Sequence, residues 1–305
     1  MASAKVVAAG LAVVVLWASA FPAIRMAAPE LGPIGLSFIR LLVATFALLL
    51  LAPFLKVRMP AARDLLLISV TAFFGMTAYQ LLLNTGEFFV PAGTASIIVA
   101  AAPLVSVGIA VVAFREKLTG IRIVGSILAL AGVVTVCLAR AGLSLTATVW
   151  IVVAAMIVQG IYHPLSRMLL RRYTALEVAI YAMVAGTIMT IPFVPFGWQA
   201  IVPATPVAWL GAIYLGILPS AVGFVLWGYA VARLPVITST SLLYLVPAVA
   251  VLISFVWLGE VPLPVELFGG AVVIVGVAGI SQGDRILARF RRREPDLVLE
   301  AVAPR

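Results

Sequence analysis

The chain has 305 residues, of which 64% are hydrophobic and only 10% are charged, and its mean hydropathy is +1.23. A water-soluble domain could not bury this much apolar surface, so the composition excludes soluble globular and disordered classes. The net charge of +9 does not indicate a nucleic-acid partner, because the basic residues lie between apolar stretches. The single cysteine, Cys137, allows no disulfide and no thiolate metal site, and we expect no metal or cofactor.

Apolar segments of membrane-spanning length follow one another along the chain, separated by polar or Pro/Gly breaks. A hydrocarbon core of about 30 Å requires about 20 apolar residues per helix. Lipid-exposed backbone must satisfy its own hydrogen bonds, so each segment is predicted to be a helix. The ten predicted segments are 6–26, 34–54, 65–86, 93–114, 121–139, 148–168, 177–196, 207–230, 237–258 and 265–283.

The positions of lysine and arginine predict the orientation of these segments, because both residues favour the cytoplasmic side. With the N-terminus inside, 17 of the 20 basic residues fall on the cytoplasmic side. Arg25 and Arg140 fall outside, and Arg40 lies within the second segment. We therefore predict a multi-pass protein of the cell (inner) membrane, in contact with lipid and with both termini in the cytoplasm.

An internal repeat relates the two halves of the chain. Residues 94–138 align with 238–282 at a constant offset of 144 and without a gap. The basic loop residues Arg115 and Lys117 of the first copy have no basic counterparts in the second. Loss of a basic loop on duplication indicates that the second copy is inverted in the bilayer. We expect a first repeat over 1–142, a second over 143–284 and a cytoplasmic basic tail over 285–305.

Several short motifs resemble one known family. Trp17-Ala-Ser-Ala-Phe21 lies in the first predicted segment and Phe38-Ile-Arg40 in the second, and an acidic turn at Glu116 recurs at Glu260. Their order resembles the EamA branch of the drug/metabolite transporter superfamily, and within it the YddG-type amino-acid exporters. The resemblance implies an all-α integral membrane fold of ten helices in two inverted five-helix repeats. It also implies a basket-like shape with a central cavity lined by segments 1, 3, 4, 6, 8 and 9.

The substrate of an inverted-repeat carrier is expected near the bilayer midplane, between the repeats. Aromatic or polar residues at that level, several of them mismatched between the copies, are the candidates. We predict a substrate cavity lined by Trp17, Ser19, Tyr79, Leu83, Gln159, His163, Trp227 and Tyr244. Ordinary packing or interhelical hydrogen bonds would also explain several of them. On the third segment, the Gln80 face is the alternative to the favoured Tyr79 face.

Prolines recur at matching places in the two halves and predict where the helices bend. A proline removes a backbone donor and leaves a carbonyl one turn earlier without its helical partner. The predicted hinges are Pro22, Pro103, Pro164 and Pro247.

The acidic residues bear on energy coupling. No Asp or Glu lies at the centre of a predicted segment. Proton antiporters keep such a carboxylate, so its absence favours facilitated transport unless His163 carries the proton. Arg40 lies about 9 Å inside the second segment at 1.5 Å per residue, and either snorkels to the outer surface or pairs with Glu87.

The sequence as a whole predicts a monomeric exporter of amino acids, aromatic and other neutral ones among them, or of related small metabolites. A proton-coupled drug or cation exporter is the alternative within transport. An intramembrane enzyme is disfavoured because no paired Asp residues, metal-ligand spacing or Ser-His set is present. A scaffold is disfavoured because scaffolding does not require a pseudo-twofold cavity.

Overall fold

This computed structural model describes residues 4–55, 57–114, 119–141, 147–231, 233 and 245–279. All regular secondary structure within these residues is helical. A π-helix interrupts two of the rods, at η2 and η4. The last helix of the described part of the chain, Pro264–Gly279, is called here the C-terminal helix. The other elements are α1 Ala4–Leu51, η1 Ala62–Asp64, α2 Leu65–Ala72, η2 Phe73–Ala78, α3 Tyr79–Phe89, α4 Ala92–Val99, α5 Ala102–Phe114, α6 Gly120–Ala141, α7 Ala147–Leu170, α8 Ala175–Thr190, η3 Ile191–Phe193, α9 Val194–Ile201, α10 Pro206–Leu215, η4 Gly216–Val222, α11 Gly223–Val231 and α13 Leu245–Leu258.

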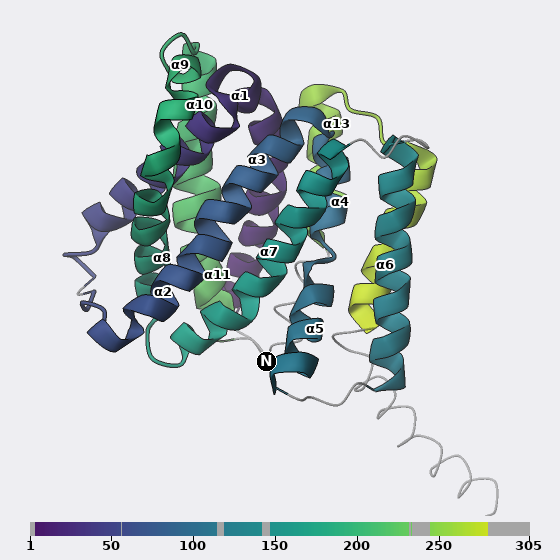
Figure 1. Cartoon of the computed structure of the whole chain (residues 1–305), viewed down its shortest axis with the longest axis horizontal. Helices are drawn as coiled ribbons and strands as arrows, with labels where there is room; N and C mark the ends of the chain where they lie inside the picture. The colour runs from purple at the N-terminus through teal and green to yellow at the C-terminus, as the bar shows by residue number, and fades with distance from the viewer. Residues whose placement is uncertain are drawn as a thin grey trace, which may run out of the picture.

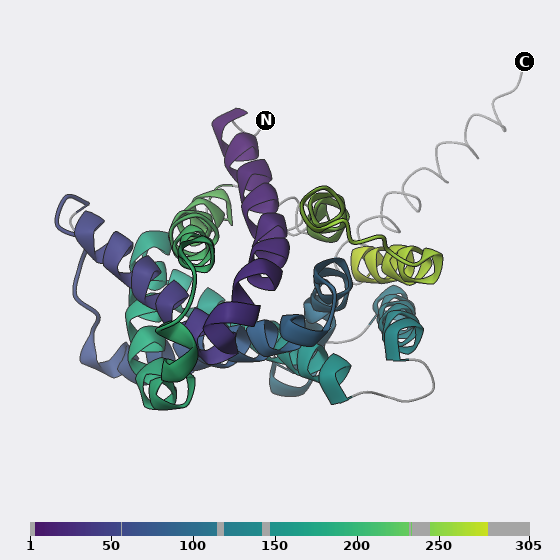
Figure 2. The same cartoon turned by 90° about the horizontal axis from the view of Figure 1, so that it is seen from above.

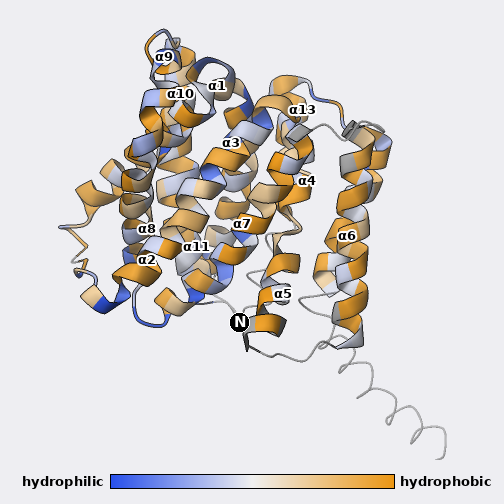
Figure 3. Ribbon diagram, viewed as in Figure 1, coloured by the Kyte–Doolittle hydropathy of each residue, from blue (hydrophilic) through white to orange (hydrophobic). Residues whose placement is uncertain are grey.

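Among the described residues, five helical rods are long and apolar enough to cross a membrane, and shorter apolar helices accompany them. Hydrophobic residues cover most of their length, and hydrophilic residues gather toward the two ends of the bundle (Figure 3). The protein is therefore an all-helical, multi-pass membrane protein. Most of the described helices overlap the predicted segments, but η1 lies outside them and α9 extends past residue 196. The count of ten crossings remains a prediction.

The first two predicted segments form one element, α1, which folds back on itself at Gly32. Gly32 has φ 67°, a left-handed conformation that glycine adopts without steric cost. The predicted boundaries were wrong here. The first helical arm continues past residue 26 to the turn at Gly32, and the second ends at Leu51. The end of the bundle that carries this turn is called the Gly32 end, and the opposite end the Arg58 end.

α6 and the C-terminal helix lie side by side at one edge of the bundle (Figures 1 and 2). Glycines allow their backbones to touch, as is usual where membrane helices associate. A Cβ atom on Gly132 would lie 2.7 Å from the carbonyl oxygen of Gly269, and one on Gly276 would lie 2.7 Å from that of Gly125. The two helices are antiparallel, because positions rise along one as they fall along the other.

These two contacts are the same contact in the two copies of the repeat. An offset of 144 converts Gly125 into Gly269 and Gly132 into Gly276, so each glycine of a pair meets the counterpart of the other. Equivalent helices that pack antiparallel are related by a twofold axis perpendicular to them. For membrane-spanning helices that axis lies in the membrane plane, which is the symmetry of an inverted repeat.

The π-helices obey the same symmetry. Adding 144 to the bounds of η2, Phe73–Ala78, gives residues 217–222, which lie within η4, Gly216–Val222. Such π-segments are rare and often occur at functional sites. Both repeats therefore keep an irregular turn at the same level of the third helix of each copy.

We predict that Gly276→Ala destabilises the protein, because the Cβ of the alanine would clash with backbone atoms of α6, which cannot move away as a flexible side chain can. Overpacking of this kind costs about 1–3 kcal/mol in the free energy of unfolding. Gly108→Ala is the matched control, since a Cβ there would meet nothing within 4 Å. Chemical unfolding of the purified protein in detergent measures both. Equal stability of the two variants would contradict the close helix contact.

Candidate substrate pathway

Trp17 contacts the eighth predicted segment through its ring and its N–H group. Its ring lies 5.4 Å from Phe224 and 5.4 Å from Trp227, centroid to centroid. Its Nε1 atom donates a hydrogen bond of 3.1 Å to the carbonyl oxygen of Pro219, inside the π-helix η4. The absence of a side chain at Gly223 permits this approach, because a Cβ there would lie 2.8 Å from Nε1.

The first repeat contains a related arrangement around its own π-helix. The ring of Tyr162, on α7, packs directly over Gly75 in η2. Tyr162 lies 6.3 Å from Phe224 and 5.7 Å from His163, so a continuous chain of rings runs from Trp227 through Trp17, Phe224 and Tyr162 to His163. The sequence prediction missed Tyr162. The available signals were its neighbour His163, a predicted cavity residue, and Gly75, a small residue at the same level of the bundle.

Ser19 faces a different aromatic residue. Its hydroxyl donates to the Leu16 carbonyl at 2.9 Å and shares a hydrogen bond of 2.6 Å with the Tyr214 hydroxyl. The ring centroid of Tyr214 in turn lies 6.4 Å from that of Trp257. Tyr214 was not a candidate from the sequence, because nothing in the repeat alignment distinguishes it.

The remaining predicted cavity residues differ in environment. Leu83 is buried and belongs to the main apolar core, against which the half-buried Tyr79 packs. Gln159 is 9% exposed, and its Oε1 atom has no hydrogen-bond partner. His163 is half-buried. Tyr244 lies outside the described residues. The structure thus brings Trp17, Trp227 and His163 into one chain of ring contacts.

The predicted hinge prolines lie in two kinds of backbone. Pro22 lies inside the first arm of α1, before the turn at Gly32, and Pro164 lies inside α7. Pro103 follows a break at residues 100–101, which separates α4 from α5. Pro247 is buried near the start of the described part of its segment, in α13. Bending at these places remains a prediction.

Arg40 corrects one expectation. It does not snorkel to the surface, because it is only 5% exposed and its Nε atom donates to the Ser220 hydroxyl at 2.8 Å. It interacts electrostatically with Glu87, the alternative partner, but without a hydrogen bond, because both carboxylate oxygens of Glu87 lack hydrogen-bond partners. The guanidinium is therefore held between the second and eighth predicted segments.

At the Gly32 end, polar contacts join the two repeats. Arg25 Nη1 donates to the carbonyl oxygens of Glu87, at 2.9 Å, and Phe88, and its Nε lies 3.8 Å from the Glu260 carboxylate. Glu260 also accepts from the Ala92 backbone N–H at 3.0 Å. Glu260 was expected to act only as a turn residue, since sequence cannot show that its partners lie in the other repeat.

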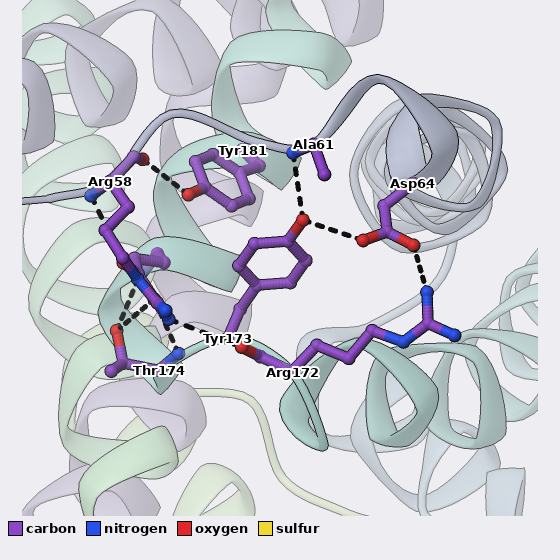
Figure 4. A network of polar contacts seen from close by, with 8 residues as sticks. Arg58, Ala61, Asp64, Arg172, Tyr173, Thr174 and Tyr181 are labelled. Atoms are coloured by element: carbon purple, nitrogen blue, oxygen red, sulfur yellow. Dashed lines mark hydrogen bonds and ion pairs between the residues drawn. The ribbon is translucent and has the colours of Figure 1, made fainter.

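At the Arg58 end, a second polar network also joins the repeats (Figure 4). Arg58 forms two hydrogen bonds to the Glu177 carboxylate, at 2.7 and 2.9 Å, and the Tyr181 hydroxyl donates to the Arg58 carbonyl. The Tyr173 hydroxyl donates to Asp64 at 2.7 Å, and Arg172 pairs with the same carboxylate. Hydrogen bonding to Glu177 raises the pKa of Arg58 above its usual value, so Arg58 stays charged.

An inverted repeat of apolar helices, tied across both ends by polar contacts, is typical of membrane transporters. A family model supports this class directly. The model of the EamA-like transporter family matches residues 4–138 and again residues 146–282. The chain belongs to the EamA-like transporter family.

Individual relatives agree with this assignment. A "Probable terminal-alkyne amino-acid exporter" of Streptantibioticus cattleyicolor is 50% identical over 291 residues, which cover 95% of this chain and 97% of the relative. A "Probable amino-acid metabolite efflux pump" of Salmonella typhimurium is 24% identical over 88% of this chain and 91% of the relative. A crystal structure at 19% identity, covering 90% of this chain and 96% of its own, has a TM-score of 0.63 and shares the fold.

We predict that Trp17→Phe lowers the free energy of unfolding by about 1 kcal/mol, because it keeps an aromatic ring but removes the hydrogen bond to Pro219. Trp150→Phe is the control, since Trp150 is 50% exposed on the apolar surface of α7. Unfolding in detergent measures both. If Trp17→Phe is as stable as the control, the hydrogen bond contributes nothing.

We also predict that Arg58→Gln lowers the unfolding temperature at low ionic strength, because Glu177 loses its charged partner. The loss should shrink in about 1 M salt, since Arg58 is exposed and its ion pair is screened. Arg63→Gln, which changes an exposed arginine of the same segment, should have little effect. A salt-independent loss, or an equal loss in both variants, would contradict an electrostatic tie at this end.

Proposed function

We propose that this protein exports amino acids, including aromatic and other neutral ones, or related small metabolites, across the cell (inner) membrane. It works as a monomeric, facilitated carrier with both termini in the cytoplasm, and it catalyses no chemical reaction. Its two repeats, 1–142 and 143–284, rock about a site between them, and 285–305 forms a cytoplasmic tail.

The observation that carries this proposal is the 50% identity to a probable terminal-alkyne amino-acid exporter, which extends over nearly the full length of both chains. Substrate class is a property of the residues that line the pathway. A relative this similar over its whole length is expected to share many of them. A more distant relative described as an amino-acid metabolite efflux pump points to the same class.

The aromatic ring chain is consistent with such substrates. The rings of Trp17, Phe224 and Tyr162 offer apolar faces to a neutral or aromatic side chain. The Oε1 atom of Gln159 and the ring of His163 supply polar groups nearby on α7. A terminal alkyne is also an apolar, rod-shaped group that such rings can accommodate.

Alternating access would use the cross-repeat contacts at the two ends as closures. Arg25 with Glu260 would close the outer side, and Arg58 with Glu177 the cytoplasmic side. Export then requires the two closures to open in turn, with bending at Pro22, Pro103, Pro164 and Pro247.

The proposal is tested by efflux of radiolabelled amino acids from liposomes that contain the purified protein. The panel includes aromatic and small neutral amino acids and one terminal-alkyne amino acid, propargylglycine. We expect downhill flux of several members above that of protein-free liposomes. No flux of any member from correctly inserted protein would refute amino-acid export.

The same liposomes distinguish a facilitator from a proton-coupled exporter. We expect an imposed pH gradient not to drive accumulation of any amino acid above its equilibrium level, because no acidic residue lies at the centre of a predicted span. Gradient-driven accumulation, or uptake of organic cations in place of amino acids, would favour the proton-coupled drug or cation exporter.

A further inference from the structure

We infer that a buried polar stripe between α1 and α3 binds the two charged groups of an amino-acid substrate, with Arg40 taking the carboxylate and Glu87 the ammonium group. This inference rests on the proposed amino-acid export and assigns residues to recognition of the zwitterion.

The stripe occupies one face of α3. Gln80, Asn84 and Glu87 are spaced four and three residues apart, so they project from the same side of the helix. Each is at most 1% exposed. All three carry acceptor atoms without a hydrogen-bond partner, namely Gln80 Oε1, Asn84 Oδ1 and both carboxylate oxygens of Glu87.

The second arm of α1 provides the opposite wall. Asn84 Nδ2 donates to the Ser37 hydroxyl at 2.8 Å, which ties the two helices together at this level. Arg40 lies one turn beyond Ser37 and is oriented by its hydrogen bond to Ser220 in the π-helix η4. Its Nη1 atom has no partner, although Arg40 interacts electrostatically with Glu87.

Polar atoms without hydrogen bonds are costly in a buried site, and here Arg40 and Glu87 interact electrostatically without a hydrogen bond between them. An α-amino acid supplies both missing partners in one molecule. Its carboxylate accepts from the guanidinium, for which arginine is well shaped. Its ammonium group has three N–H donors, and the stripe has four free acceptor atoms, on Gln80, Asn84 and Glu87.

The location also fits a transport cycle. Arg25, which pairs with Glu260, donates to the backbone carbonyl of Glu87 and so lies over the end of the stripe. Opening of this contact would expose the stripe at the Gly32 end. The apolar ring chain around Trp17 meets the same π-helix, η4, that positions Arg40, so side chain and zwitterion would be recognised from one element.

The test uses competition in the liposome assay, which requires no transport of the competitor. The probes are the best-transported amino acid of the panel, its N-acetyl derivative, which lacks the ammonium group, and its amide, which lacks the carboxylate. For the wild-type protein, each derivative should inhibit flux at least about tenfold less well than the parent, because one charge-assisted interaction is missing.

Two variants that remove a charge then test which residue binds the ammonium group and which binds the carboxylate. Glu87→Gln should reduce flux of the parent amino acid and should bring the inhibition by the N-acetyl derivative closer to that by the parent. Arg40→Gln should bring the inhibition by the amide closer to that by the parent. Glu30→Gln, which alters an exposed acidic residue near the Gly32 turn, is the control and should change neither ratio.

The outcomes separate the two proposals. Absence of amino-acid flux in the wild-type protein refutes the proposed function. Wild-type flux that is inhibited equally well by the parent and both derivatives refutes the inference without any variant. Folded variants with reduced but measurable flux that keep both preference ratios show that the stripe only holds water or stabilises packing, and this also overturns the inference.

Discussion

The structure depends on a backbone contact between helices that occupy the same place in the two repeats. Glycines at 125, 132, 269 and 276 allow α6 and the C-terminal helix to touch in an antiparallel arrangement. In a bilayer there is little hydrophobic driving force between helices, so close packing and polar contacts must hold them together. Because the contact is symmetric under the repeat offset, the same residues that join the halves also fix their inverted relation.

On this symmetric frame, the candidate site is asymmetric. The π-helices η2 and η4 occur at equivalent positions, yet different aromatic residues approach them, Tyr162 in one half and Trp17 in the other. Ser220 of η4 holds Arg40, whereas its counterpart in η2 is Met76. A transporter that binds one small molecule between two repeats needs such differences, since a single zwitterion has no twofold symmetry.

Much of the fold could be predicted from hydropathy, basic residues and the repeat, because these reflect the bilayer directly. Segment boundaries failed at residues 27–33, where helix continues to Gly32 and one left-handed glycine makes the turn. The ring chain was predicted only in part, since Tyr162 reaches Phe224 through packing across segments that sequence cannot order. The contacts of Arg40 and Glu260 could not be predicted from the sequence either, because their partners lie 180 residues away for Arg40 and 168 residues away for Glu260.

Alternating access between the two polar closures is tested most directly by spin-label distances at both ends of the reconstituted protein. In a background with Cys137 replaced, one pair is placed at Phe89 and Val261, and a second at Arg63 and Arg171, all exposed positions in opposite repeats. On addition of a transported amino acid, the distance at one end should lengthen while that at the other shortens. Distances that change in the same direction, or do not change, would contradict the account.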